Sequence, residues 1–274
     1  MYAINEIRAA LPVDLSPTPH SHWLVKNREC SAAVDAVNSH LSGGTGSYAV
    51  EQLKVAVNRD IFRCTLTERP LRFVAKTFPM GSIKQQISSY KRYGPTEARN
   101  LIEARKRNLP VPELYGFGWQ QRGFRIKRTM VLIEDLQGFS PLTTIQNVTD
   151  EMAQLAILRP VADALLNLYA AGCNHIDLSV SNIFVNDRNP ANIRLIDFMY
   201  VVYLPAGSTN VLAFHAAYLS DSLRQYGVAE KTCREWAKEL FSRGVIAAAP
   251  GELISKYDSF RGRRLSRKQR LALT

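Results

Sequence analysis

The stretch that decides the fold is His175-Ile176-Asp177-Leu178-Ser179-Val180-Ser181-Asn182, followed by Leu195-Ile196-Asp197-Phe198. It runs from a carboxylate to a carboxamide five residues later, then through an apolar strand to a second carboxylate. Each polar residue taken singly could simply cap a turn, because Asp and Asn often bond the backbone nearby. Their order and spacing together favour one shared site instead.

Two short apolar runs, 183–185 and 192–196, lie between the carboxamide and the second carboxylate. The turn-forming residues Asp187-Arg188-Asn189-Pro190 separate them, so the pattern predicts a hairpin. A hairpin of that length brings Asp197 back beside Asn182. Together with the first carboxylate, these oxygen-bearing side chains suit a hard cation such as Mg²⁺ that carries phosphate.

This arrangement resembles the His-x-Asp-x-x-x-x-Asn and Asp-Phe motifs of protein-kinase-like phosphotransferases. The resemblance implies an α+β, bilobal protein-kinase-like fold. Its N-lobe would be a five-stranded antiparallel sheet with a helix, and its C-lobe would be mainly helical.

Composition limits the classes of protein that the chain can be. A length of 274 residues allows one large domain or two lobes, and a hydrophobic content of 46% is enough for a real core. The start of the chain lacks a signal-peptide pattern, and no apolar run reaches the roughly 18 residues of a membrane span. The scattered cysteines form no C-x-x-C pair, so they favour neither a disulfide framework nor a zinc site and fit a cytoplasmic protein: Cys30, Cys64, Cys173 and Cys233.

The net charge of +11 favours an anionic partner, although a merely soluble basic protein is the plain alternative. The candidates are nucleic acid, an acidic membrane surface, or a phosphorylated or carboxylated substrate.

Residues 1–48 form an N-terminal extension with few clear signals. Residues 31–41 favour a short helix. The cluster Ser42-Gly43-Gly44-Thr45-Gly46 could cradle a phosphate, but it lacks the G-x-G-x-x-G spacing and a preceding strand. We therefore interpret it as a loop.

A meander of strands is expected next, over residues 50–57, 61–66 and 71–78. Asn58-Arg59-Asp60 and Arg69-Pro70 supply the turns between them. Residues 113–118 and 128–133 complete the predicted sheet, and the chain leaves it at Glu134-Asp135-Leu136.

Lys76 lies between apolar residues of the third predicted strand, so it must either extend to solvent at a sheet edge or meet an anion. Helices are predicted over 83–92 and from Gly94-Pro95 to Leu109. Glu97 falls in the first turn of the second helix, where it either complements the helix dipole or pairs with Lys76.

The second half of the chain is predicted to be mainly helical. Thr149 or Asp150 would cap a helix that ends near Ala171-Gly172. Further helices are expected over 210–226, 230–242 and 250–257, followed by a basic tail over 261–274. We place the lobes at 49–135 and 136–260.

With these parts in order, the sequence resembles the lipopolysaccharide core kinases, the Kdo and heptose kinases of the protein-kinase-like superfamily. The likeness runs from about Leu53 to Phe198. Besides the catalytic loop, these stretches carry it: 53–63, Phe73-Val74-Ala75-Lys76, Glu97-Ala98-Arg99-Asn100-Leu101, Asn108-Leu109-Pro110-Val111-Pro112, Tyr115-Gly116-Phe117-Gly118 and 131–136.

The resemblance implies an ATP- and Mg²⁺-dependent sugar kinase of the bacterial cytoplasm that phosphorylates the lipopolysaccharide inner core. Asp177 would be the base, and Asn182 and Asp197 would bind Mg²⁺. Lys76 would hold the ATP phosphates and Glu97 would orient it. The remaining nucleotide contacts would come from the turn at Asn58 and Arg59 and from the backbone at Glu134 and Leu136.

Departures from the pattern narrow the acceptor. Ile176 replaces the arginine of regulated protein kinases, and Ser179 replaces their lysine, which favours a small-molecule acceptor. Met199 stands where Asp-Phe-Gly has glycine, no A-P-E follows, and no glycine-rich nucleotide loop is visible. An aminoglycoside- or choline-kinase-like enzyme, a protein kinase and a pseudokinase binding module are the alternatives.

The expected partner is the lipopolysaccharide core or another anionic acceptor, and nucleic acid is disfavoured. The basic tail would hold the protein at the anionic inner face of the membrane, although a solvated terminus explains its charge equally well. Nothing in the pattern indicates an oligomeric state.

Overall fold

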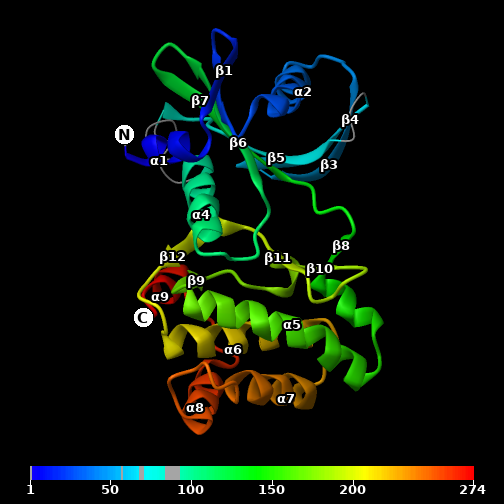
Figure 1. The fold of residues 1–274 in the computed structure, drawn as a ribbon, viewed down its shortest axis with the longest axis vertical. Helices are drawn as coiled ribbons and strands as arrows, with labels where there is room; N and C mark the ends of the chain where they lie inside the picture. The colour runs from blue at the N-terminus through cyan, green and yellow to red at the C-terminus, as the bar shows by residue number, and fades with distance from the viewer. Residues whose placement is uncertain (1, 57, 68–70, 84–92) are drawn as a thin grey trace. The chain divides into compact units, whose positions relative to one another are not determined.

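The computed structural model describes residues 2–56, 58–67, 71–83 and 93–274, which form two compact units. Unit 1 comprises Met1–Ala104 and Pro112–Leu136, and unit 2 comprises Arg105–Val111 and Gln137–Thr274 (Figure 1). The predicted kinase-like division into a sheet-rich and a helical part is therefore present.

Unit 1 is built on a seven-stranded antiparallel sheet in the order β1-β2-β6-β7-β5-β4-β3. The strands are β1 (Val13–Thr18), β2 (Ser21–Val25), β3 (Tyr48–Ala56), β4 (Arg59–Leu66), β5 (Arg72–Pro79), β6 (Leu114–Arg122) and β7 (Arg125–Glu134). Five of these were predicted, from β3 to β7.

The prediction of a five-stranded sheet was wrong by two strands, both from residues 1–48. β1 is a mostly exposed edge strand that contains Pro17, which only an edge position tolerates. β2 is buried along nearly its whole length, so it lacks the polar–apolar alternation of a strand with one wet face. Residues before position 48 thus belong to unit 1 and do not form a separate extension.

Three helices of unit 1 are described: α1 (Tyr2–Ala10), α2 (Ser31–Leu41) and α4 (Gly94–Lys106). α2, predicted with the same bounds, packs Val34 and Val37 into a core with Trp23, Phe62 and Phe73 of the sheet. The glycine cluster after it is a loop, as predicted. The helix predicted over 83–92 lies, apart from Ile83, outside the described residues, as do the turn at Arg69-Pro70 and the end of the first strand at Val57.

Unit 2 is mainly helical. Its helices are α5 (Glu151–Ala170), α6 (Thr209–Gln225), α7 (Glu230–Phe241), α8 (Pro250–Phe260) and α9 (Arg267–Leu271). Two small ladders accompany them, β8 (Phe139–Pro141) with β10 (Ile183–Asn186) and β11 (Ile193–Leu195), and β9 (Cys173–His175) with β12 (Val201–Tyr203). Short 3₁₀ turns span Arg28–Cys30 in unit 1 and Leu142–Asn147, Val180–Asn182 and Phe198–Tyr200 in unit 2.

The central helix α5 begins and ends where the sequence predicts. The Asp150 carboxylate accepts a hydrogen bond from the Ala153 amide at 2.7 Å, a typical N-cap. Gly172 follows the helix with a φ of 63°, in the left-handed region that favours glycine. α9, by contrast, was not predicted, because its five residues are too few to show a helical period. Across the described residues, no helix is long and apolar enough to span a bilayer.

Glycine is required at position 172 by the lack of space for a side chain as well as by the backbone φ angle. A Cβ on this residue would lie 2.1 Å from the Leu204 carbonyl oxygen, which itself belongs to backbone and has little freedom to move. We expect Gly172→Ala to lower the free energy of unfolding by about 2 kcal/mol or more. Thermal and urea denaturation would measure this. Gly251→Ala, in α8 where a Cβ meets open space, is the matched control and should be neutral or mildly stabilising.

Candidate active site

The catalytic stretch of unit 2 is held by a buried histidine. His175 lies at the end of β9, and its Nε2 is 2.9 Å from the Ile196 carbonyl oxygen. Because a carbonyl only accepts, Nε2 carries the proton. Burial lowers the pKa of His175, so the ring is neutral at pH 7. Its edge also meets the Phe198 ring at 5.0 Å, so His175 braces the backbone on both sides of Asp197.

The predicted hairpin brings Asn182 and Asp197 together. Ile183 of β10 pairs with Leu195 of β11, and the Ile196 amide donates to the Asn182 carbonyl at 3.0 Å. The Asn182 side-chain amide donates to the Asp177 carbonyl at 2.8 Å. The carboxamide is therefore tied to the backbone of the first carboxylate, and its oxygen remains the atom suited to a cation.

Asp197 has a left-handed backbone, with φ 64° and ψ 53°. For a residue other than glycine this conformation costs about 1–2 kcal/mol, although Asp and Asn tolerate it best. The chain keeps it because β11 before Asp197 and the 3₁₀ turn after it fix both sides. Strain of this kind concentrates at functional residues.

The carboxylate of Asp177 is paired with an arginine that the sequence did not single out. Arg270 of α9 donates at 2.8 Å to Asp177 Oδ1 and at 2.7 Å to the Ile176 carbonyl. The Asn174 side chain, in turn, donates to the Arg270 carbonyl at 2.9 Å. Arg267, one turn earlier, stacks its guanidinium 3.8 Å over the Tyr200 ring. Within the predicted basic tail over 261–274, residues 267–271 thus form a helix that docks on the rest of unit 2 through Arg267 and Arg270.

In unit 1, Lys76 and Glu97 form a buried ion pair. Their side chains are 7% and 1% exposed. Lys76 lies opposite Ile61 of β4 and Val131 of β7, so β5 is an interior strand and the edge-lysine interpretation is excluded. Glu97 comes from the first turn of α4, and it meets the lysine as the functional interpretation requires.

The other predicted nucleotide residues lie at the ends of the sheet of unit 1. Asn58 lies in the turn before β4, and Arg59 is the first residue of β4. The Glu134 amide donates to the Glu113 carbonyl at 2.8 Å, and the Glu134 carboxylate accepts from the Glu113 amide at 3.0 Å. Leu136 is the last residue of unit 1. Their contacts with a nucleotide stay predictions.

Asp135 is a further charged residue that the sequence left without a role. Its side chain is 2% exposed and lies 2.9 Å from Arg63 Nε and 3.0 Å from Arg72 Nε. It ties β4 and β5 to the end of β7. An acidic residue directly after a long apolar strand is the signal that could have indicated a buried pairing.

The side-chain oxygens of Asn182 and Asp197 suit Mg²⁺ better than a metal whose ligands all come from the protein. No three His, Cys, Asp or Glu side chains cluster as a metal site in the parts of the chain that the structure describes. Mg²⁺ needs no such cage, because it usually takes one or two protein oxygens and completes its shell with water and phosphate. Asn182 and Asp197 would supply those oxygens. The cysteines do not compete, since all four are buried free thiols, and burial raises the pKa of Cys64 to about 12 and that of Cys233 to about 11.

Comparison with known families agrees with this geometry. Residues 90–200 match the model of the lipopolysaccharide kinase (Kdo/WaaP) family. The resemblance to the lipopolysaccharide core kinases is confirmed. The match spans less than half of the chain, and it includes Glu97 and the catalytic stretch but not Lys76.

Among solved structures, the chain is similar to WaaP in complex with acyl carrier protein, with a TM-score of 0.56 and 13% identity over 86% of this chain and 96% of that one. At that identity the likeness shows the protein-kinase-like fold alone. The autoinhibited serine kinase domain of titin is more distant, with a TM-score of 0.44 and 15% identity over 78% of this chain and 66% of that one. No curated protein sequence matches the chain. The family supports a lipopolysaccharide kinase activity and hence phosphoryl transfer.

Removing only one partner of the Lys76–Glu97 pair should lower the free energy of unfolding strongly. Lys76→Met would leave the Glu97 carboxylate buried without a cation, which typically costs about 3–5 kcal/mol. Lys76→Met with Glu97→Leu should recover much of that loss, because both charges are then gone. Urea denaturation of the single and double variants would measure the coupling.

The exposed Arg8–Asp14 pair of the same unit provides the control. Its side chains are 56% and 55% exposed, so Arg8→Ala should change the free energy of unfolding by less than about 1 kcal/mol. Equal losses for Arg8→Ala and Lys76→Met would contradict a special role for the buried pair.

Proposed function

We propose that the chain is an ATP-dependent kinase that phosphorylates a hydroxyl of a heptose or Kdo sugar in the lipopolysaccharide inner core. The observation that carries the proposal is the hydrogen-bonded loop that joins Asp177, Asn182 and the backbone before Asp197. The family match over the same residues supports it.

In this mechanism the residues of unit 2 position the acceptor and the metal. Asp177 orients the sugar hydroxyl and accepts its proton as the phosphoryl group leaves ATP. Asn182 and Asp197 would hold Mg²⁺, and a bound Mg²⁺ would supply positive charge to offset that of the transferred phosphoryl group. In-line transfer depends mainly on such positioning and charge neutralisation, since the protein forms no covalent intermediate.

Residues of unit 1 would bind the nucleotide. Lys76 would hold the ATP phosphates and Glu97 would fix its ammonium. The turn at Asn58 and Arg59 would cover the phosphates, and the backbone at Glu134 and Leu136 would bind adenine. These four contacts rest on the resemblance and on the place of each residue in the sheet.

The acceptor is proposed to be a small molecule because Ile176 and Ser179 depart from the protein-kinase pattern. We also propose that the protein acts in the cytoplasm with peripheral contact to the anionic membrane. The net charge of +11 supports that contact. A structural neighbour is described in complex with acyl carrier protein, and a protein partner of this kind is a proposal for this chain as well.

The proposed activity predicts ATP consumption with purified lipopolysaccharide cores and not with an aminoglycoside or a generic protein. Asp177→Asn should lower turnover at least about a hundredfold, because a positioned base typically contributes about 10² to 10⁴ in rate. Nucleotide affinity should change little. Asp187→Asn, at an exposed turn of the same hairpin, removes the same charge and should retain full turnover.

Preferred consumption with the aminoglycoside would replace the proposed acceptor and leave the phosphotransferase in place. Full turnover in Asp177→Asn would remove that residue from its role as the base.

Asp197→Asn should weaken the binding of Mg²⁺ with a nonhydrolysable ATP analogue by about tenfold or more, since even residues that only support a metal ligand contribute that much. Asn tolerates the left-handed backbone at this position, so the variant should fold normally. Titration calorimetry with and without Mg²⁺ separates the metal from the nucleotide. An unchanged Mg²⁺-dependent affinity would rule out Asp197 as a ligand.

A further inference from the structure

A cavity of about 380 Å³ in unit 2 lies directly beside the Asp177–Arg270 pair. α6 supplies an aromatic wall with Phe214 and Tyr218. The segment after α8 supplies Arg263 and Arg264, and α9 supplies Arg270, whose guanidinium lies 5.4 Å from the Tyr218 ring centre. We call this cavity the arginine pocket.

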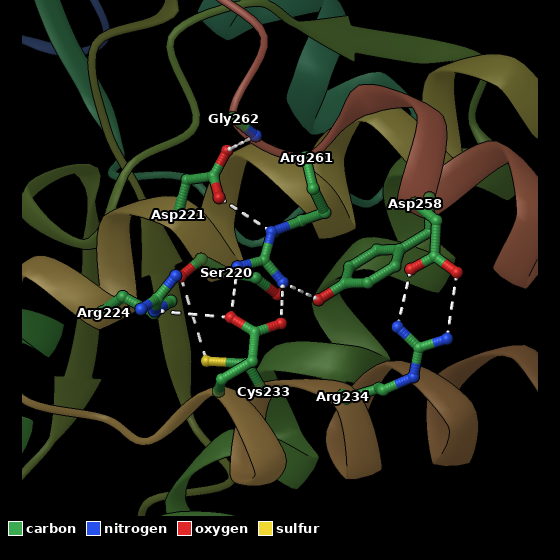
Figure 2. Close-up of polar contacts among 10 residues, drawn as sticks. Ser220, Asp221, Arg224, Cys233, Arg234, Asp258, Arg261 and Gly262 are labelled. Carbon is green, nitrogen blue, oxygen red and sulfur yellow. Dashed lines mark hydrogen bonds and ion pairs between the residues drawn. The ribbon is translucent and has the colours of Figure 1, made fainter.

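The acidic residue in the arginine pocket is already neutralised. Asp221 accepts from Arg261 Nε at 2.7 Å through one carboxylate oxygen, and from the Gly262 amide at 2.7 Å through the other, as Figure 2 shows. Both oxygens are therefore occupied. Asp221 therefore holds the chain where it leaves α8, and its negative charge is offset by Arg261.

The backbone before Arg263 and Arg264 is held by the side chain of Arg261. The Arg261 guanidinium also bonds both oxygens of Glu230, at 2.8 and 2.7 Å, and is one-eighth exposed. Gly262 follows with a φ of 69°, which turns the chain toward the pocket. Paired, buried Arg261 thus anchors the segment, and Arg263 and Arg264 extend from a rigid base.

The pocket keeps a positive charge that the described residues do not offset. Arg263 and Arg264 are exposed and meet no carboxylate within the described part of the chain. Arg270 is largely buried and shares its charge with Asp177, while its Nε has no hydrogen-bond partner among the described residues. Arg270 lines the pocket together with Arg263 and Arg264, and guanidinium groups with unused N–H donors favour a bound anion.

We propose that the arginine pocket binds an anionic group of the acceptor, a phosphate or a carboxylate, while Asp177 orients the hydroxyl to be phosphorylated. This rests on the proposed function and deepens it, because it names the chemistry of the acceptor. Guanidinium groups bind such planar or tetrahedral anions through paired hydrogen bonds, and the aromatic wall offers a face for a sugar ring. Arg270 links the binding of the anion to the position of Asp177, since it bonds Asp177 and lines the pocket.

The proposal is tested by binding of three sugars that differ in one group: glucose 6-phosphate, glucuronate and glucose. Calorimetry is done on the full chain with Mg²⁺ and a saturating nonhydrolysable ATP analogue, which occupies the nucleotide site. At least one charged sugar should bind about tenfold or more tightly than glucose, and the stronger of the two identifies phosphate or carboxylate. Arg263→Ala with Arg264→Ala should remove that preference.

Lys268→Ala is the matched control, because Lys268 is an exposed cation of the neighbouring helix α9 that does not line the pocket. It should keep the preference within about twofold. With lipopolysaccharide cores as acceptor, the double variant should raise KM about tenfold or more at a nearly unchanged kcat. Equal thermal unfolding of the three proteins excludes misfolding, since the changed side chains are exposed.

Equal binding of glucose and both charged sugars, or equal effects of the double variant and Lys268→Ala, would overturn the proposal. Loss of binding to phosphatidylglycerol vesicles in the double variant, with no charged-sugar preference in the parent, would assign the arginines to a lipid headgroup and also overturn it. A charged-sugar preference in a chain without kinase activity would retain the pocket and reject the proposed function.

Discussion

The hydrogen bond between the neutral His175 ring and the Ile196 carbonyl is the contact on which the catalytic stretch depends. It joins two segments 21 residues apart and so fixes the loop from Asp177 to Asn182 against the strand that ends at Asp197. Burial keeps the imidazole neutral, because water is not present to solvate the charged form. His215 of α6 lies behind it, and burial lowers the pKa of that ring to about 3. The two buried histidine rings next to the loop are therefore polar but uncharged.

Several charged side chains with little exposure to solvent form ion pairs. Two cations with little exposure are paired, Lys76 with Glu97 and Arg261 with Asp221 and Glu230. A buried charge without a partner would cost several kcal/mol, so these pairs hold elements together at fixed positions. Arg63 and Arg72 do the same around Asp135 at the edge of unit 1. In unit 2, the exposed Arg263 and Arg264 line the same pocket as Arg270, which pairs with Asp177.

Local chemistry decided how much of the fold could be predicted. The α2 and α5 helices follow from their apolar periods and, for α5, from the cap at Asp150 and the stop at Gly172. The strands β3 to β7 follow from their apolar patterns and turn residues. β1 and β2 were missed because an exposed edge with Pro17 and a fully buried strand both lack the alternation that a half-buried strand shows. The short helix α9 was missed because its stability comes from docking, through Arg267 on Tyr200 and Arg270 on Asp177, and not from its own period.

The sequence alone determined the order of the catalytic groups, because their hydrogen bonds run between residues a few positions apart or across one hairpin. Asp177, Asn182 and Asp197 could be placed together from spacing and a turn, and Lys76 and Glu97 could be named as candidates for a pair. Only the tertiary structure decided that β5 is an interior strand, that the first 48 residues complete the sheet, and that the basic C-terminal segment is docked. The physical reason is distance along the chain. Arg270 and Asp177 are 93 residues apart, and no local pattern encodes a contact that exists only once the helices of unit 2 have packed.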